Sequence, residues 1–441
     1  IVGMAQTFVG SNNINLLMPN GQFGSRAMGG KDAASARYLH TVLNKVTRFI
    51  FPEADDHILN YVEEDGKLVE PTFYTPIIPM VLVNGAEGIG TGWATNIPNY
   101  CPRQIAHNIL NKLDGKEMNR MDPYFKGYTG ELTPGDKGYS VKGSYNFHEE
   151  SNSLEITELP IKKWTRDYKN YLEEMMQDKD QKLVAIDDMR EYHTSRKVHF
   201  LINFDSSQRE LSEAEIEKIF KLTGNISTAN MVLFDESLKI RKYATEIEIL
   251  EEFVGIRMRY YHLRKDYLIS RIERDIAMME NKYRFISEVN DDIVIISKKA
   301  KKQIVKQLID RKYTPHSKLP RIKSSIEDNI IAKLQKDEEE AGQGEGEEGG
   351  EGQERQGAGG MSAEEGLVEK NAKEYNYLLS MPIWAMSLEQ LEKLKKEIDG
   401  KMNDLKNLQR KPVEDIWRED IKKFLEVLDK VENEEAKEIE K

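Results

Sequence analysis

Residues 249–267 read ILEEFVGIRMRYYHLRKDY, and their large apolar side chains recur at alternating steps of four and three residues. This spacing is typical of helices that pack along one another, so the segment predicts a long amphipathic helix. After a phase shift the same spacing continues to residue 286. The apolar positions of the two parts are Ile249, Phe253, Ile256, Tyr260, Leu263 and Tyr267, followed by Ile272, Ile276, Met279, Tyr283 and Ile286.

A second amphipathic segment follows about a hundred residues later. Ser387 and Gln390 have the spacing of a capping box, which predicts a helix start. Two such arms predict an antiparallel coiled coil with a globular tip at roughly 289–384, and a plain helical bundle is the alternative. The apolar positions of the returning arm are Leu388, Leu391, Leu394, Ile398, Met402 and Leu405, then Trp417, Ile421, Phe424 and Leu428.

The part before residue 246 has a mixed pattern. The bounded apolar run 76–83 and the alternation of apolar and polar residues over 197–204 predict strands, whereas 104–112 and 212–222 have helical spacing. The mixture indicates the α+β fold class. Nearer the N-terminus, the glycine-rich stretch 20–32 predicts a loop. We expect a helix after it, with Asp32 as its N-cap and an apolar stripe formed by Leu39, Val42, Leu43, Val46, Phe49 and Ile50.

Composition and length limit the class of protein. The chain has 441 residues, of which 39% are hydrophobic and 32% charged, so we expect two to four folding units with long solvated helices. No apolar run approaches the ~20 residues of a membrane span, so we expect no membrane partner. Cys101 is the only cysteine, which excludes an intrachain disulfide framework and indicates a reducing compartment.

The net charge of -12 is distributed unevenly. Residues 337–369 contain twelve acidic side chains, one basic side chain and ten glycines, a composition that predicts a disordered acidic loop. Residues 1–50 carry five basic side chains and one acidic side chain, a net charge of +4. We therefore expect a polyanion to bind the N-terminal segment.

The pair Arg37 and Tyr38 lies in this basic segment. A free phenol has a pKa near ~10 and is a poor nucleophile at neutral pH. A neighbouring cation stabilises the phenolate and can hold the charge of a phosphoryl transition state, so the pair is a candidate for nucleophilic attack on a phosphate. The competing interpretation is that Tyr38, one of nineteen tyrosines, lies at a helix edge without chemical function.

Three further stretches are candidates for nucleic-acid contact. The glycine-rich loop lacks the Walker pattern, but Arg26 and Lys31 accompany its exposed backbone and could contact a phosphate. Ile89 stands between glycines of the segment 84–93 and could enter a base step as an apolar wedge, unless it is a buried residue of a tight connection. Trp164 lies among Lys162, Lys163 and Arg166, which favours a DNA contact about as much as a core position.

No metal site is predicted on this chain. The eight histidines show no spacing of metal ligands, and the adjacent aspartate pairs occur in unrelated contexts, where solvated charge explains them better.

Several motifs together closely resemble eukaryotic DNA topoisomerase II, a type IIA topoisomerase. The likeness covers nearly the whole chain except the acidic loop. The segments that carry it are 21–26 (GQFGSR), 29–38 (GGKDAASARY), 76–93 (PIIPMVLVNGAEGIGTGW), 156–160 (ITELP), 231–235 (MVLFD) and 376–384 (NYLLSMPIW).

The resemblance implies roles for individual residues. In that family a tyrosine attacks a DNA phosphodiester and leaves a 5′-phosphotyrosyl link, and a second duplex passes through the break before it is resealed. Tyr38 matches the nucleophile, and Arg37 matches the arginine beside it that stabilises the transition state. Ile89 matches the isoleucine that intercalates into the gate DNA, and Trp164 matches a tower-domain tryptophan that contacts DNA.

The resemblance also implies an architecture and an assembly. It implies a homodimer that binds double-stranded DNA, closes through a C-terminal gate and acts in the nucleus or an organelle. It further implies ATP and Mg²⁺ for the full-length enzyme, whose ATPase and TOPRIM domains have no counterpart on this chain, so we expect the isolated chain to be incomplete. The implied parts are the end of a winged-helix domain at 1–55, a tower at 56–245, one coiled-coil arm at 246–288, the C-gate globular part at 289–384, and the returning arm with the C-terminal helix at 385–441.

Two other classes of protein would explain part of the pattern. A noncatalytic DNA-binding or chromosome-architecture protein would use the coiled coil and leave Tyr38 structural. A tyrosine recombinase would need further basic and histidine partners, and no motif in the sequence supplies them.

Overall fold

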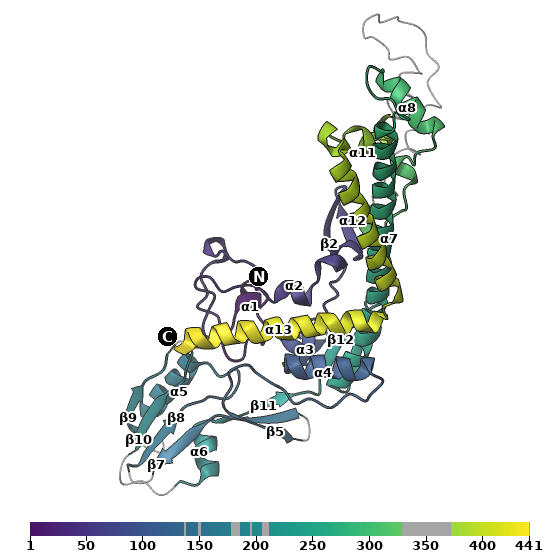
Figure 1. The fold of residues 1–441 in the computed structure, drawn as a ribbon. Coiled ribbons are helices and arrows are strands. Elements are labelled where there is room, and N and C mark those ends of the chain that lie inside the picture. Colours follow the sequence, from purple (N-terminus) through teal and green to yellow (C-terminus); the bar gives the residue numbers. More distant parts are fainter. Residues whose placement is uncertain are drawn as a thin grey trace, which may run out of the picture. The chain divides into compact units, whose positions relative to one another are not determined.

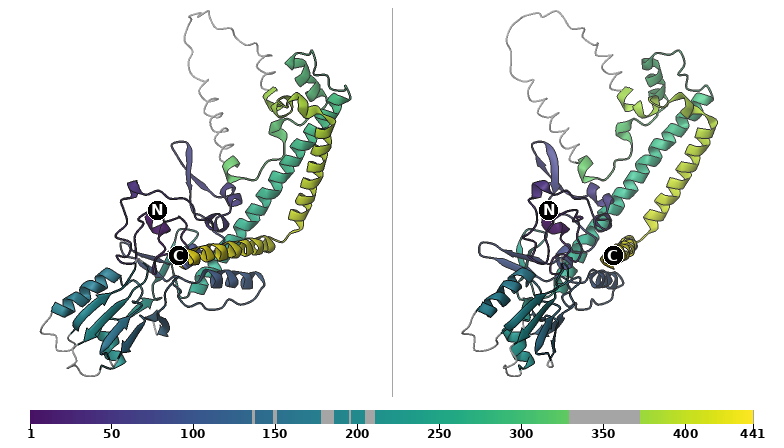
Figure 2. Two further views of the ribbon diagram at one scale, coloured as in Figure 1. Left: turned by 60° about the vertical axis from the view of Figure 1, so that its left-hand side comes forward. Right: turned by 90° about the vertical axis from the view of Figure 1, so that its left-hand side faces the viewer.

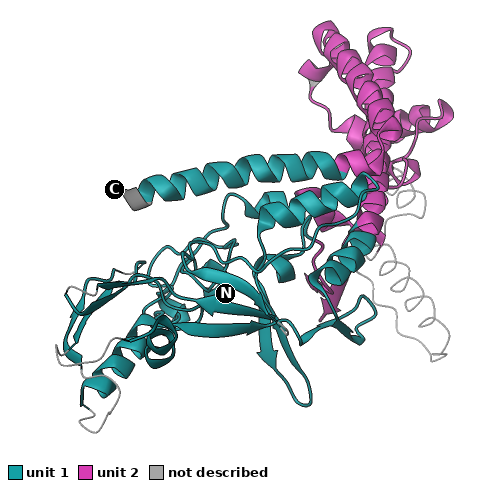
Figure 3. Cartoon of the chain, turned by 90° about the horizontal axis from the view of Figure 1, so that it is seen from below, with its two compact units in different colours: residues 1–52, 76–257, 417–441 teal, residues 53–75, 258–416 magenta. Residues whose placement is uncertain are grey.

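The computed structural model describes residues 1–135, 138–148, 151–177, 186–194, 196–204, 211–328 and 372–440. The predicted acidic loop at 337–369 lies outside them. The chain forms two compact units (Figure 3). Unit 1 comprises Ile1–Pro52, Pro76–Arg257 and Trp417–Lys441, and unit 2 comprises Glu53–Thr75 and Met258–Ile416. None of the described helices is long and apolar enough to cross a membrane.

The N-terminal segment of unit 1 differs from the predicted helix. Residues 42–44 are extended and pair with residues 16–18, because Met18 N donates to Val42 O (2.9 Å) and Asn44 N donates to Leu16 O (3.0 Å). Asp32 does not cap a helix but accepts hydrogen bonds from Ser25. Long-range pairing has overridden the local apolar pattern. The helical turns of this segment are α1 Val2–Ala5, η1 Ala36–Tyr38 and α2 Thr47–Ile50.

The apolar run 76–83 is also not a strand. Its end forms the short helix α3 (Met80–Val83), and Ile77, Ile78, Leu82 and Val83 are fully buried. Pro76 and Pro79 lack the backbone N–H groups that a ladder requires, and the carbonyl of Pro79 accepts from Val83 N (3.1 Å) to close a helical turn. The predicted helix that follows is confirmed as α4 (Pro102–Leu113).

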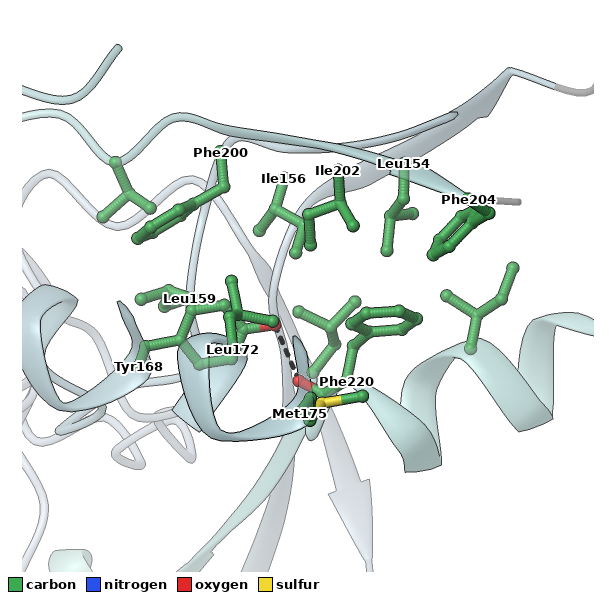
Figure 4. Packing of buried hydrophobic residues seen from close by; sticks show 13 residues of the cluster. Leu154, Ile156, Leu159, Tyr168, Leu172, Met175, Phe200, Ile202, Phe204 and Phe220 are labelled. Atoms are coloured by element: carbon green, nitrogen blue, oxygen red, sulfur yellow. Dashed lines mark hydrogen bonds between the residues drawn. The ribbon is translucent and has the colours of Figure 1, made fainter. Parts of the chain in front are cut away.

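Unit 1 contains two antiparallel sheets of more than two strands (Figure 1). The predicted alternation is confirmed in β10, where Phe200, Ile202 and Phe204 are buried. Figure 4 shows these side chains facing Tyr168, Leu172 and Phe220 from the helical side. The four-stranded sheet has the order β7 (Tyr145–His148), β8 (Ser153–Ile156), β10 (Phe200–Phe204), β9 (Ile186–Glu191), and the three-stranded sheet has the order β11 (Thr223–Ser227), β6 (Gly138–Lys142), β5 (Glu131–Gly135).

Unit 1 also contains two helices beside the four-stranded sheet and two hairpins. α5 and α6 pack on the core of the four-stranded sheet, and α6 begins with the capping box of Ser212 and Glu215. The bounds are α5 Thr165–Gln177, α6 Glu213–Ile219, β3 Ala86–Ile89 paired with β4 Ala94–Ile97, and β12 Met231–Phe234 paired with β13 Ile240–Tyr243.

Unit 2 is built on two long helices that lie side by side (Figures 1 and 2). α7 (Glu246–Asn290) passes from unit 1 into unit 2, and α12 (Leu388–Arg410) lies antiparallel to its second part. The direction follows from two contacts: Lys401 Nζ lies 2.6 Å from Asp275 Oδ2, and Lys265 Nζ lies 3.0 Å from Gln409 O. The predicted start of α12 is confirmed, since Ser387 Oγ accepts from Gln390 N.

The buried face of α7 differs from the predicted apolar stripe at residues 263 and 264. Leu263 is 49% exposed, whereas its neighbour Arg264 is buried. Arg264 Nε and Nη2 donate to the two carboxylate oxygens of Asp55 at 2.6 and 2.7 Å, and Tyr267 stacks on His57. A buried bidentate ion pair therefore occupies a position where the sequence pattern predicts solvated charge.

The helix α13 begins in the last residues of unit 2 and continues into unit 1, where the predicted apolar residues Trp417, Ile421, Phe424 and Leu428 are buried. The other elements of unit 2 are short. The bounds are η2 Glu53–His57, β1 Tyr61–Glu64, β2 Lys67–Pro71, α8 Lys301–Asp310, η3 His316–Lys318, α11 Asn376–Leu379, η4 Ile383–Met386 and α13 Val413–Glu440.

A cluster of hydrogen bonds around one carboxylate, that of Glu288, joins the end of α7 to the end of α8. Glu288 accepts from Arg311 Nε (2.7 Å), Tyr313 Oη (2.8 Å) and Arg284 Nε (2.9 Å). The hydrogen bond from Arg311 is the largest cause that lowers the pKa of Glu288, to about 2. The ionised carboxylate therefore stabilises unit 2 at neutral pH.

The pH dependence of unit 2 tests this cluster. Because the folded-state pKa is lowered, the stabilisation is present above the ordinary pKa of 4.5 and is lost as the pH falls toward 2. Glu288→Gln should cost on the order of 1–2 kcal/mol at pH 7, after allowance for solvent screening, and should flatten the dependence of unfolding free energy on pH in that window. Denaturant unfolding at a series of pH values measures both effects. Glu280→Gln on the same helix is the control, and equal profiles for the two variants would contradict the prediction.

Candidate active site

The structure presents Tyr38 on a short helical turn. The 3-10 helix Ala36–Tyr38 closes when Tyr38 N donates to Ser35 O (2.9 Å), and the Tyr38 side chain is 68% exposed. Arg37 is also exposed, and its Cζ lies 4.9 Å from the centroid of the Tyr38 ring. The predicted pair of a phenol and a cation is thus brought together at the surface. A guanidinium in this position can stabilise negative charge on the phenol oxygen or on a phosphate that meets it.

The glycine-rich loop before Tyr38 has a shape that only glycine permits. Gly24 has a φ of +99°, and a Cβ there would lie 2.6 Å from Gly30 Cα. Asp32 closes the loop, since its carboxylate accepts from Ser25 N (2.9 Å) and Ser25 Oγ (2.6 Å). Partial burial raises the pKa of Asp32, but the hydrogen bonds from Ser25 outweigh it and leave the pKa below its ordinary value. The loop is therefore a closed backbone structure rather than an open phosphate cradle.

The two basic residues of this loop have different environments. Lys31 is exposed, as a phosphate contact requires. Arg26 is 5% exposed and forms an ion pair with the buried carboxylate of Glu158. The prediction that Arg26 contacts a phosphate is therefore corrected: its guanidinium is occupied inside unit 1, and Lys31 alone keeps that role as a prediction.

Trp164 lies against the same loop. It is half-buried, and its indole packs so closely on Gly29 that a Cβ at Gly29, where φ is +61°, would overlap it. Phe8 meets the indole edge-on, with ring centroids 5.8 Å apart. The sequence left a DNA contact and a core position open for Trp164, and the contacts place it beneath the loop that leads to Tyr38.

Ile89 lies at the tip of the hairpin formed by β3 and β4. Its side chain is 94% exposed, so the interpretation of Ile89 as a buried residue is wrong. The turn is closed by Gly90 N, which donates to Trp93 O (2.8 Å), and by Gly92 with a φ of +81°. An exposed isoleucine on a tight, glycine-rich hairpin has the form of an apolar wedge.

Sequence reasoning did not single out Glu158 or Glu87. Glu158 lies in the segment 154–160 (LEITELP), where apolar residues alternate with two glutamates and a threonine, so no local pattern indicates that Glu158 is buried and Glu155 is not. Glu87 forms an ion pair with Lys162, which joins the wedge hairpin to the segment 158–166. Trp93 lies at the tip of the same hairpin as Ile89 and is 55% exposed, and the sequence predicts no role for it.

Comparison with known proteins identifies the class. The family of the A subunits of DNA gyrase and topoisomerase IV matches residues 1–422, and the chain belongs to this family. Among its relatives, DNA topoisomerase 2-alpha of Gallus gallus is 41% identical over 437 residues, which are 98% of this chain and 26% of that protein. DNA topoisomerase 2 of Plasmodium falciparum is 40% identical over 433 residues, which are 97% of this chain and 29% of that protein. The chain thus spans less than a third of the length of these relatives.

A solved structure agrees with the sequence comparison. The crystal structure of the Plasmodium falciparum topoisomerase II DNA-binding, cleavage and re-ligation domain superposes with a TM-score of 0.84 at 38% identity, covering 100% of this chain and 56% of that one. The predicted resemblance to eukaryotic DNA topoisomerase II is confirmed. The interpretation as a noncatalytic architectural protein is not favoured by these matches.

Substitution of Gly24 tests whether the loop shape depends on glycine. Gly24→Ala should lower the unfolding free energy of unit 1 by ~2 kcal/mol, because the new methyl group meets the Gly30 backbone and the residue must keep a positive φ. Gly3→Ala is the matched control, since a Cβ at Gly3 has no neighbour within 4 Å. Chemical denaturation compares the two variants. If both changed stability by the same amount, the loop would have to tolerate a side chain at Gly24.

Proposed function

We propose that this chain is the DNA breakage and rejoining region of an ATP-dependent type IIA DNA topoisomerase, with Tyr38 as the nucleophile. The observation that carries the proposal is the exposed Tyr38 phenol with the Arg37 guanidinium 4.9 Å from its ring, on a loop closed by glycines and Asp32. The relative whose structure matches is described as a DNA-binding, cleavage and re-ligation domain.

The proposed step is a reversible transfer of a phosphodiester. The Tyr38 phenol loses its proton, and its oxygen attacks the phosphorus of gate DNA. The bond from phosphorus to the 3′ oxygen breaks, the 3′ oxygen takes up a proton, and the phosphate stays on Tyr38 as a 5′-phosphotyrosyl link. Arg37 stabilises the negative charge that develops on the phosphate. The reverse attack by the 3′-hydroxyl reseals the strand without loss of a high-energy bond.

Two further exposed residues of unit 1 would bind the duplex. Lys31 would contact a phosphate and Ile89 would enter a base step to bend the gate DNA, at the cost of unstacking that step. While the break is open a second duplex passes through, which relaxes or decatenates DNA. In this proposal the segments 1–55, 56–245 and 246–288 correspond to the end of a winged-helix domain, the tower and one coiled-coil arm.

The whole enzyme would need more than this chain. We propose a homodimer that closes through the C-gate globular part at 289–384, acts on double-stranded DNA in the nucleus, and uses ATP and Mg²⁺. Residues 385–441 would form the returning coiled-coil arm and the C-terminal helix. Among the described residues, no group of three or more His, Cys, Asp or Glu side chains is placed to hold a metal ion. In this proposal the ligands for ATP and Mg²⁺ belong to other parts of the enzyme.

Loss of the phenol oxygen tests the nucleophile. Tyr38→Phe, in a polypeptide where the chain follows the metal-binding region of a topoisomerase II, should abolish the covalent complex with a nicked duplex in the presence of Mg²⁺. Denaturing gels with end-labelled DNA measure the complex, and filter binding checks that DNA is still bound. Tyr74→Phe is the control, since Tyr74 is likewise exposed, at 60%. A covalent complex that persists in Tyr38→Phe would contradict the proposal that Tyr38 is the nucleophile.

Truncation of Ile89 tests the wedge. Ile89→Ala should reduce the bending of gate DNA and leave the affinity for DNA within about tenfold of that of the unsubstituted protein. The affinity changes little because the free energy spent on unstacking a base step is offset by the contacts that the bent DNA gains. Energy transfer between dyes at the two ends of a duplex reports the bend. Leu238→Ala removes a comparably exposed apolar side chain, at 75% exposure, from another hairpin and serves as control. Unchanged bending in Ile89→Ala would show that Ile89 is not a wedge.

A further inference from the structure

The glycine-rich loop 20–32, which precedes the turn with Tyr38, is held by residues 158–166 and by Gln6, whose Nε2 donates to Phe23 O (3.0 Å). The segment 158–166 contributes the ion pair of Arg26 with Glu158, hydrogen bonds from Arg166 to Ala27 O (3.0 Å) and to Met28 Sδ (3.6 Å), and the packing of Gly29 on Trp164. These contacts of the segment all fall within residues 26–29, ahead of the turn that presents the phenol.

The carboxylate of Glu158 is fully engaged. Its Oε1 accepts from Arg26 and from Leu159 N (2.9 Å), and its Oε2 accepts from Thr129 N (3.3 Å) and Thr129 Oγ1 (3.1 Å). Both Glu158 and Arg26 are almost completely buried. A buried charge with this many partners has one favoured position, so Glu158 fixes the Arg26 end of the loop.

Trp164 fixes the other end of the same short stretch. Its indole fills the space beside Gly29 and also touches Gly10, where an added Cβ would lie 3.5 Å from Cη2. A smaller side chain at 164 would leave a cavity below Gly29, and the loop could then move into it.

The position of the loop is passed on to Tyr38 through the backbone. Ala34 N donates to Gln22 O (2.9 Å), which ties the end of the loop to its beginning, and the turn with Tyr38 starts directly afterwards. The segment 158–166 also reaches the wedge hairpin through the ion pair of Lys162 with Glu87. One segment thus contacts both the loop of the nucleophile and the hairpin of the wedge.

We propose that Glu158 and Trp164 are positioning residues for Tyr38, with Trp164 acting through its packing against Gly29. This assignment rests on the proposed function. It predicts a loss of reaction rate once DNA is bound, because a displacement of about 1 Å from the reactive geometry can cost on the order of 10²-fold in rate.

The test measures the rate of covalent complex formation at saturating DNA and, separately, the dissociation constant for DNA. It uses the polypeptide that includes the metal-binding region, a nicked duplex and Mg²⁺. Glu158→Gln and Trp164→Phe should each lower the rate about 10- to 100-fold and change the dissociation constant less than about threefold. Glu155→Gln is the matched control: it removes a carboxylate from the adjacent strand β8, where Glu155 pairs with His199 instead of the loop.

A double variant separates positioning from a loss of folding. Arg26→Met leaves Glu158 unpaired, whereas Arg26→Met with Glu158→Leu replaces the whole pair by apolar side chains, so the double variant should form the covalent complex faster than Arg26→Met alone. If Glu158→Gln does not fold, Trp164→Phe and the double variant still decide the question.

The outcomes distinguish this assignment from the proposed function. A Trp164→Phe protein with weaker DNA binding and an unchanged rate at saturation would overturn the assignment in favour of a direct DNA contact. Unchanged rates in all of these variants would overturn it as well. Absence of the covalent complex in the unsubstituted protein would instead contradict the proposed function itself.

Discussion

The close approach of backbone to backbone in residues 21–32 is the constraint on which the site depends. Gly24 lies so near Gly30 that no side chain fits between them, and Asp32 locks the crossing by accepting two hydrogen bonds from Ser25. Ordering a glycine-rich loop costs more conformational entropy than ordering other sequences. The buried pair of Arg26 with Glu158 and the packing of Trp164 on Gly29 offset part of that cost. The result is an exposed tyrosine that directly follows an anchored loop.

This arrangement reconciles exposure with order. In the proposed function the nucleophile must meet a large polyanion, so it has to lie at the surface, where side chains ordinarily move freely, yet its reaction requires a defined approach. Tyr38 is 68% exposed, but the residues before it are anchored in unit 1. Ile89 follows the same principle, because a hairpin with Gly90 and Gly92 at its tip presents an apolar side chain that is 94% exposed. The acidic net charge does not oppose DNA binding, since the first fifty residues are basic.

Sequence reasoning succeeded where local periodicity and packing agree. The alternation in β10, the spacing in α12 and the cap at Ser387 predicted real elements. The alternation in β10 corresponds to a buried face, whereas in α12 Ile398 is buried and Leu388 is 71% exposed. It failed for 76–83 and for the helix after Asp32, where prolines and a pairing with residues 16–18 decide the backbone. Arg37 and Tyr38 were singled out from the sequence as a candidate pair, but neither the exposure of Tyr38 nor the burial of Arg26, Arg264 and Glu158 was predicted, since contacts between distant residues leave no local pattern.

The central claim is that one particular tyrosine among nineteen forms the link to DNA. The most direct measurement is to trap the covalent complex on a nicked duplex, digest the protein and the DNA, and identify by mass spectrometry which tyrosine carries a nucleotide. The account predicts a 5′-linked nucleotide on the peptide that contains Tyr38 and on no other tyrosine peptide. A nucleotide on a different tyrosine, or none despite tight DNA binding by an intact dimer, would contradict it.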